Sequence, residues 1–105
     1  MAEKDITHNT EKRSFELQVD GHKATLMYNP VKPSVWSLNH TYVPAQLEGQ
    51  GIGSKLVKHV LTHCENNDIR IIPRCPFIDA YIRRHPEWKD LVHEESNKNS
   101  YGTTR

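Results

Sequence analysis

Hydrophobic and polar residues alternate strictly over residues 15–19, which read Phe-Glu-Leu-Gln-Val. A period of two predicts a strand with one buried face. Asp20-Gly21 follows and supplies the positive φ angles of a tight hairpin, so a second strand is expected over about 23–28. Residues 29–33 carry Asn-Pro and a second proline, and they are predicted to form a loop.

β-Branched and aromatic residues dominate 34–43, which predicts a third strand that ends at Pro44. A glycine-dense turn over 47–53 then leads into a predicted helix over 53–66. At about 100° per residue, the apolar positions of this helix fill one half of its circumference and polar residues fill the other. The pattern is typical of a helix that packs on a sheet.

The remaining chain predicts a short buried strand over 69–73, a helix over 77–84 and a helical turn that begins at Pro86. The predicted order is β-β-β-α-β-α. A hairpin followed by a βαβ crossover gives a mixed α/β domain, with a mostly antiparallel sheet and one parallel pair of strands. Residues 1–12 are expected to form a flexible lead-in, and 93–105 a disordered tail.

The composition fits one small domain, residues 13–92, because 105 residues leave no room for a second core. The 14 Lys and Arg residues balance 13 Asp and Glu, and this net charge of +1 argues against a nucleic-acid or anionic-membrane partner. The N-terminus lacks the basic-then-apolar pattern of a secretory signal, and two cysteines make no disulfide framework. We expect a reduced, cytoplasmic protein, and nothing in the sequence excludes a monomer.

Three glycines, at 49, 51 and 53, lie where the third strand turns into the helix. Glycine there lets backbone amides approach a ligand and point one way, beside the positive end of the helix dipole. Such a turn suits phosphate or pyrophosphate, although loops also need glycine for other reasons. The turn lacks the Gly-Lys-Ser/Thr ending of a Walker loop, and its third glycine comes too early for a dinucleotide-binding fingerprint.

Residues 49–56, Gly-Gln-Gly-Ile-Gly-Ser-Lys-Leu, resemble the coenzyme A pyrophosphate loop of the GCN5-related N-acetyltransferases, whose pattern is Gln/Arg-x-x-Gly-x-Gly/Ala. Residues 40–44, His-Thr-Tyr-Val-Pro, and 72–77, Ile-Pro-Arg-Cys-Pro-Phe, are similar to the very small, single-domain group of that family. Tyr81 and Pro86-Glu87-Trp88 extend the similarity. The resemblance covers about 13–92 and implies a minimal fold of that type, in which the parallel pair of strands splays apart.

Two features depart from the family pattern. Glu48 stands where the family has Gln or Arg, which places a carboxylate near the expected pyrophosphate. The two helices that usually separate the first two strands and help to bind the acceptor are replaced by the hairpin turn at Asp20-Gly21. We therefore expect an acceptor site that is open or built differently, and the acceptor amine, a small molecule or a protein, stays unidentified.

The resemblance implies acetyl-CoA as the cosubstrate. The end of the strand 34–43 would lie beside the pantetheine arm, and amides of the glycine turn would hold the pyrophosphate. Arg83 or Arg84 would reach the nucleotide phosphates, unless both belong to a solvated basic face. The expected coenzyme-binding residues are Thr41, Tyr42, Val43, Gln50, Gly51, Ile52, Gly53, Ser54 and Arg84.

Three side chains are candidates for the chemistry. Cys75 follows Arg74 and precedes a helix, which favours a thiolate that could take the acetyl group; otherwise it is a small buried residue. His40 is a candidate general base because imidazole titrates near neutrality, and otherwise a hydrogen-bonded cross-strand residue. Tyr81 matches the family's tyrosine that protonates the departing thiolate, and is otherwise an anchor of the second helix.

His59 and His63 share a helix face next to Cys64, but no further ligand pair accompanies them, so no metal site is expected. The sequence thus predicts an N-acetyltransferase-like enzyme that transfers acetyl from acetyl-CoA to an amine, directly or through Cys75. Two alternatives stay open. One is a non-catalytic acyl-CoA or nucleotide-binding module, and the other is a protein-interaction domain that uses the sheet edge freed by the absent helices.

Overall fold

The computed structural model describes residues 6–93, so the first five residues and the predicted tail beyond residue 93 lie outside it. The strands are β1 (Ile6–Asn9), β2 (Ser14–Val19), β3 (His22–Lys32), β4 (Val35–Tyr42) and β5 (Arg70–Pro73). The helices are η2 (Ala45–Leu47), α1 (Ile52–Asn66), α2 (Pro76–Arg84) and η3 (Pro86–Leu91).

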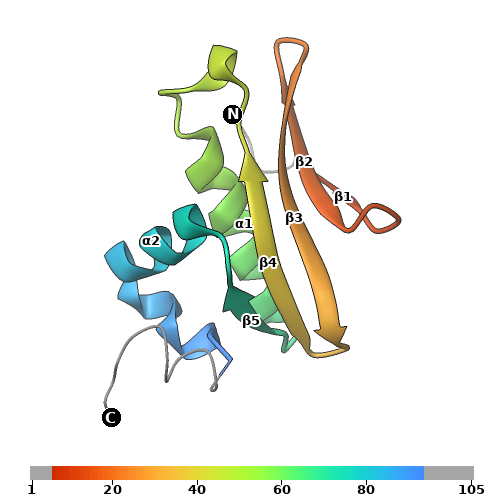
Figure 1. Cartoon of the computed structure of the whole chain (residues 1–105), viewed down its shortest axis with the longest axis vertical. Helices are drawn as coiled ribbons and strands as arrows, with labels where there is room; N and C mark the ends of the chain where they lie inside the picture. The colour runs from red at the N-terminus through yellow and green to blue at the C-terminus, as the bar shows by residue number, and fades with distance from the viewer. Residues whose placement is uncertain (1–5, 94–105) are drawn as a thin grey trace.

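One sheet holds all five strands in the order β1-β2-β3-β4-β5. Its neighbours are antiparallel except for β4 and β5, which are parallel. Figure 1 shows α1 behind the sheet, with α2 beside β5 at the edge. The predicted mixed fold is therefore confirmed. Among residues 6–93, no helix combines the length and the apolar content that crossing a membrane requires.

The hairpin between β2 and β3 turns where the sequence predicts it. Asp20 and Gly21 have φ angles of 51° and 80°, and a two-residue hairpin loop of type I′ needs both to be positive. The loop predicted over 29–33 is wrong, because β3 continues to Lys32 and stays paired with β4. Pro30 has no N–H to donate, and the register shifts between Pro30 and Lys32, which accommodates it.

The flexible lead-in predicted over 1–12 is wrong from residue 6 onward, because β1 forms the edge of the sheet. Ile6 pairs with Leu17 and is buried. The His8 imidazole stacks on the Phe15 ring, with the ring centroids 4.1 Å apart. Two inward-facing residues in a four-residue strand are too few to give a recognisable period in the sequence.

The face of the sheet behind β3 and β4 is buried against α1. The helix turns Leu56, Val57, Val60, Leu61 and Cys64 toward the sheet, and all five are fully buried. Burial of each large apolar side chain contributes about 1.5–3 kcal/mol. The helix is therefore anchored along its length, and the turn at its N-terminus is held in a fixed position.

A cluster of histidine and aromatic rings packs between α1 and β1. His63 stacks on Trp36 with centroids 5.6 Å apart and meets His8 edge-on at 5.2 Å. His8 Nε2 lies 2.5 Å from the Tyr28 hydroxyl. Burial, and after it the charge of the neighbouring histidines, lowers the pKa of His8 and His63; His59 contributes to both. Among residues 6–93 no group of three or more His, Cys, Asp or Glu side chains could hold a metal ion.

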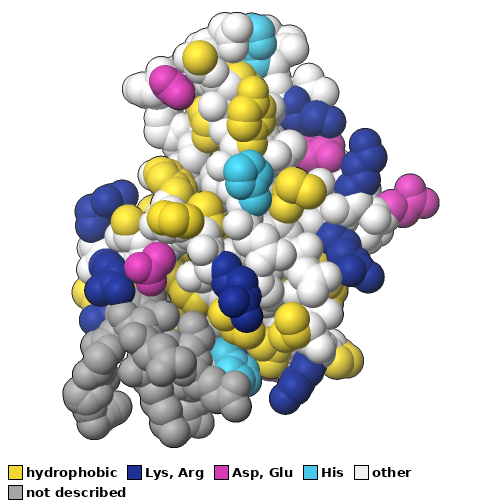
Figure 2. Space-filling view, in the orientation of Figure 1, with side chains coloured by type: hydrophobic (Ala, Val, Ile, Leu, Met, Phe, Trp, Pro, Cys, Tyr) yellow, Lys and Arg dark blue, Asp and Glu magenta, His cyan; other side chains and the backbone are white. Residues whose placement is uncertain are grey.

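The opposite face of the sheet is open to solvent around the middle of β3 and the end of β4. It carries Met27, His40 and Tyr42, which we call the open-face row; Met27 is 44% exposed and Tyr42 52%. Figure 2 views this face and shows hydrophobic and histidine side chains over the region of β4, with acidic side chains toward the margins. A two-residue turn, and no helix, joins β2 to β3, and the open-face row is exposed.

Candidate functional site

The parallel strands β4 and β5 separate after Leu38. Leu38 and Pro73 are the last pair in their register. The amides of Arg74 and Cys75 then both donate to the Leu38 carbonyl, each at 3.1 Å, and the chain turns into α2. Since β4 continues without β5, its edge over 39–42 faces a gap, which is the splay that the resemblance implies.

The turn between β4 and α1 brings backbone amides to the N-terminus of the helix. Gly49 and Gly51 have φ angles of 86° and 73°, which other residues rarely adopt. The Lys55 amide donates to the Gly51 carbonyl at 3.1 Å and starts the bonding pattern of α1. The amides of 52–54 therefore have no partner within the helix, and they lie at its positive end. This arrangement suits an anion.

A hollow of about 220 Å³ opens beside this turn. Val43, Leu47 and Phe77 give it an apolar wall, and the glycine turn with Ser54 forms the other side. Phe77 belongs to the first turn of α2, so the hollow spans the space between the N-termini of α1 and α2. A Cβ on Gly53 would lie only 3.0 Å from the Phe77 ring, so glycine at this position lets the two helix ends approach.

Glu48 lines the same hollow. Its amide donates to the Ala45 carbonyl at 3.2 Å, so the backbone of Glu48 is engaged in η2. Glu48 is exposed, and it brings a negative charge to the turn that leads into the positive end of α1. This charge opposes the binding of a second anion there.

Cys75 lies at the gap, immediately before α2, and is 7% exposed. Its thiol is 3.8 Å from the Thr41 hydroxyl, so a residue of the free edge of β4 faces it directly. Cys64 differs, because it is fully buried in the core and burial raises the pKa of its thiol to about 12. Of the two cysteines, only Cys75 is placed to take part in chemistry at the gap.

His40 lies on the other face of β4. Met27 pairs with His40 and Tyr28 with Leu38, so Asn39 forms a bulge that has no partner in β3. The bulge reverses the alternation, and His40 points to the open face while its neighbour in the chain, Thr41, faces Cys75. The structure therefore does not bring the imidazole and the thiol to the same side of the strand.

Tyr81 lies on the buried side of α2, 6% exposed, with its ring centroid 4.3 Å from that of His85. Burial, and to a lesser extent the charge of Glu87, raises the pKa of its hydroxyl. The phenol is therefore fully protonated at neutral pH, the state that a general acid needs.

The two arginines at the end of α2 have different surroundings. Arg83 Nε lies 2.9 Å from Asp79 Oδ2, one turn back along the helix. Arg84 is exposed in the last turn, about 10 Å along the helix axis from Phe77. Contact between Arg84 and a phosphate stays a prediction.

Phe77 has no role predicted from the sequence, and Arg74 is expected there only to favour a thiolate at Cys75, although both residues lie at the gap. Phe77 is 39% exposed, and Arg74 Nε donates to the Ser37 hydroxyl at 3.1 Å. A large aromatic residue four positions after a strand end, in the first turn of the next helix, is the signal that could have indicated Phe77. Nothing in the sequence indicates that Arg74 meets Ser37, which is 37 positions away.

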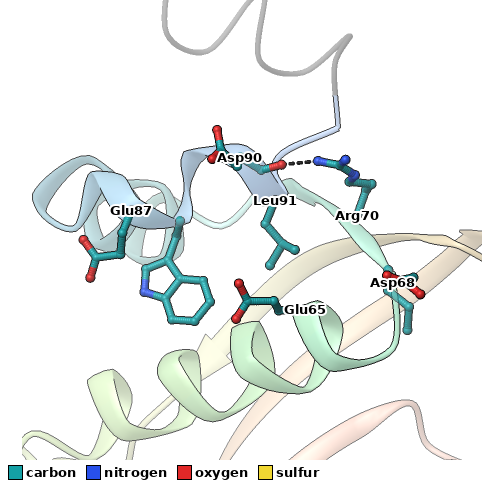
Figure 3. Close-up of a pocket in the computed structure, with 8 residues that line it drawn as sticks. Glu65, Asp68, Arg70, Glu87, Asp90 and Leu91 are labelled. Atoms are coloured by element: carbon teal, nitrogen blue, oxygen red, sulfur yellow. Dashed lines mark hydrogen bonds between the residues drawn. The ribbon is translucent and has the colours of Figure 1, made fainter.

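A second hollow, also of about 220 Å³, lies at the other end of α1, between β5 and η3. Glu65 of α1 points toward Leu91 of η3, and Arg70 Nη1 donates to the Asp90 carbonyl at its rim (Figure 3). Glu65 is twelve residues beyond Gly53, about 18 Å along the helix. This hollow is therefore separate from the gap and the glycine turn.

Comparison with known proteins decides the family. Residues 14–91 match the family model described as GCN5-related N-acetyl-transferase. The chain belongs to this family. Protein NATD1 of Gallus gallus is 29% identical over 90 residues, which cover 84% of this chain and 82% of that protein. Protein NATD1 of Homo sapiens is 29% identical over 83 residues, 77% of this chain and 74% of that protein.

A solved structure agrees with the family assignment. The solution structure of a GCN5-like protein from Staphylococcus aureus matches with a TM-score of 0.68 and 27% sequence identity. The match covers 89% of this chain and 91% of that protein. The resemblance to small, single-domain GCN5-related N-acetyltransferases is thus confirmed, together with the fold that it implies.

Proposed function

We propose that this protein binds acetyl-CoA and transfers its acetyl group to an amine. The observation that carries the proposal is the meeting, at one end of the sheet, of the free edge of β4 over 39–42 with the unpaired amides of 52–54. Members of the GCN5-related N-acetyltransferase family generally use acetyl-CoA. That coenzyme joins a pyrophosphate to an extended arm that contains amides, and the two features of the protein suit these two parts.

The backbone supplies the binding groups. Amides from Gln50 to Ser54 are available to a pyrophosphate, and the positive end of α1 favours its charge. Along the edge of β4, the backbone groups of Thr41, Tyr42 and Val43 are available to the amides of the arm, as an added strand would use them. Backbone groups keep these positions whatever side chains the chain carries, which explains why so few polar side chains line the hollow.

Bound acetyl-CoA supplies an activated acetyl thioester. In a direct transfer the amine loses a proton as its nitrogen bonds to the acetyl carbon, and the departing thiolate gains one as the carbon–sulfur bond breaks. Tyr81 holds a proton at neutral pH and is the candidate donor. His40 is exposed on the open face, from which an acceptor can approach, and is the candidate to take the proton of the amine.

A two-step transfer would use Cys75. Its sulfur would lose a proton, bond to the acetyl carbon and release the coenzyme thiol with that proton; the amine would then displace Cys75. Intact mass after mixing with acetyl-CoA separates the routes, because only the second leaves an acetyl adduct that Cys75→Ala abolishes. If Cys75→Ala keeps the wild-type rate, transfer is direct.

Calorimetric titration with acetyl-CoA tests the binding itself. Ser54→Glu places a carboxylate in the first turn of α1, where it favours the helix but repels a pyrophosphate. We expect wild-type affinity in the micromolar range, at least about 10-fold weaker binding for Ser54→Glu and near wild-type binding for Ser54→Gln. No heat with wild type, or equal affinity in Ser54→Glu, contradicts the proposal.

A non-catalytic acyl-CoA-binding module is the second candidate. It is favoured by the placement of His40 across β4 from Cys75, and by the negative charge of Glu48 at the hollow. Coenzyme release in the presence of amines decides between the two. Binding of acetyl-CoA without any release selects the module, and release that depends on an amine selects the enzyme.

A further inference from the structure

Arg74 is a cation fixed at the mouth of the gap. Its amide donates to the Leu38 carbonyl and its Nε to the Ser37 hydroxyl, both at 3.1 Å. Ser37 in turn donates to the side-chain oxygen of Asn39. The guanidinium is thereby held by one of its five N–H groups. No ion pair among residues 6–93 involves Arg74, and the side chain is exposed.

The side chain of Arg74 lies on the open side of the sheet. Ser37 alternates with Trp36 and Leu38, which face α1, so the Ser37 hydroxyl points to the opposite face. Arg74 bonds to that hydroxyl and therefore shares the face of the open-face row. It is also the residue immediately before Cys75, at the point where β4 and β5 separate.

The charge of this face is one-sided. The five strands contain a single acidic residue, Glu16. Its carboxylate lies 3.8 Å from Lys23 Nζ and accepts a hydrogen bond from the Ser14 hydroxyl at 3.2 Å, so it is already engaged. In Figure 2 one basic side chain lies near the centre of this face and no acidic side chain lies beside it. A cationic acceptor would meet Arg74 without any carboxylate to offset it.

We propose that Arg74 binds an anionic group of the acceptor, so that the acceptor is an amine that also carries a carboxylate or a phosphate. This inference rests on the proposed function. The two terminal nitrogens of a guanidinium match two oxygens of either anion in a bidentate pair. An anion bound to Arg74 lies one residue away from Cys75, so the amine of a small acceptor can reach the gap.

Met27 and Tyr42 define the rest of the acceptor. They are exposed on either side of His40 and offer apolar contact to hydrocarbon near the amine. Polyamines and lysine-rich peptides, which have the wrong charge, are excluded by the same surface. The acceptor class is therefore a small anionic amine that contains some apolar surface.

Matched pairs of amines test the role of Arg74. Tyrosine and tyramine differ by a carboxylate, and glucosamine 6-phosphate and glucosamine differ by a phosphate. We expect kcat/KM for the member that carries the carboxylate or phosphate, called the anionic member, to exceed that of its partner without the group by about 10-fold or more in at least one pair. The pair that shows the preference identifies the anion as carboxylate or phosphate.

Variants of Arg74 complete the test. Arg74→Gln should remove the preference by lowering kcat/KM for the anionic member alone, and Arg74→Lys should restore part of it. Arg70→Gln, at the far end of β5, is the matched control and should change neither member. Equal rates within both pairs, or a preference that survives Arg74→Gln, overturns the inference.

Acceptor binding gives a second readout that does not need turnover. Amide chemical shifts of residues 37–42 and 74 should move with the amines that carry a carboxylate or phosphate and not with their partners that lack it. If no anionic member is acetylated or bound, the inference is wrong. Calorimetry with acetyl-CoA on the same samples separates the two claims. Loss of coenzyme binding contradicts the proposed function, whereas normal coenzyme binding without anion preference contradicts only the role of Arg74.

Discussion

A Cβ atom on residue 53 would lie 3.0 Å from Phe77 Cζ, so Gly53 and Phe77 form the contact at which the N-termini of α1 and α2 meet. Val43 Cγ2 would be 3.5 Å from the same Cβ, and β4 thus joins the contact. The three elements that border the gap are held together here. Gly49 and Gly51 serve backbone conformation, whereas Gly53 serves packing.

A double-mutant cycle should detect this contact. Alanine in a helix is favoured over glycine by about 1 kcal/mol, but at residue 53 the Phe77 ring must shift by a few tenths of an ångström to admit it. We expect Gly53→Ala to leave the free energy of unfolding unchanged or lower in wild type, and to raise it by about 0.5–1 kcal/mol in Phe77→Ala. Urea unfolding measures both. The same change in both backgrounds would show that the contact is not felt.

Removal of the Glu48 charge should tighten coenzyme binding. Glu48 lines the hollow together with residues 52–54, where a carboxylate would compete with a pyrophosphate for the positive end of α1. We expect Glu48→Gln to improve acetyl-CoA affinity by about 2–5-fold at low salt, and by less at high salt because the charge is exposed. Glu87→Gln, at the second hollow, is the control and should leave affinity unchanged. Equal affinities for wild type and Glu48→Gln at low salt would mean that the carboxylate points away from the ligand.

Tyr81 should act in turnover and not in binding. Its hydroxyl has a raised pKa and keeps its proton, which it can give to a departing thiolate. Tyr81→Phe should lower kcat by about 100-fold or more while acetyl-CoA affinity, measured by calorimetry, stays unchanged. Undiminished turnover in Tyr81→Phe would reduce Tyr81 to an anchor of α2.

Stability should fall as the pH drops below 6.5. His8 and His63 have lowered pKa values in the folded protein. At a pH between the pKa values of the folded and the unfolded state, the unfolded chain therefore binds more protons than the folded protein does. Their contribution is complete above the unfolded value of 6.5 and is lost progressively as pH falls toward the folded values. Urea unfolding at several pH values between about 5 and 7.5 measures the slope.

A histidine variant isolates the source of that slope. His63→Phe keeps a ring against Trp36 but removes one titrating group, and it should flatten the pH dependence. His22→Gln, at the start of β3, lies outside the cluster and should keep the wild-type slope. If both variants titrate like wild type, the cluster does not control acid stability.

The elements that the sequence predicts well are those in which one local rule acts over many residues. The apolar positions of α1 and the alternation of β2 mark one buried face each, and Asp20-Gly21 has few alternatives to a hairpin. β1 escapes notice because it is short and its stability comes from pairing with β2 and from the His8–Phe15 stack. The continuation of β3 through Pro30 depends on a register shift that only the partner strand reveals.

Some features of the candidate site can likewise be predicted from local sequence, and others cannot. The glycine turn and the position of Cys75 at a strand end follow from residue types and spacing. The sequence does not predict which face of β4 carries His40. Simple alternation from Leu38 would turn the His40 side chain toward α1. The bulge at Asn39 reverses the alternation and turns His40 to the open face. The contacts Arg74–Ser37 and Gly53–Phe77 join residues that are distant in sequence, so no local pattern predicts them.

An amide chemical-shift titration with acetyl-CoA tests the central claim most directly, because it reports both binding and its place. We predict saturable shifts concentrated at residues 39–43, 50–54 and 75–77, the free edge of β4, the glycine turn and the start of α2. No shifts, or shifts centred on the second hollow around Glu65 and Leu91, would contradict the proposed coenzyme site.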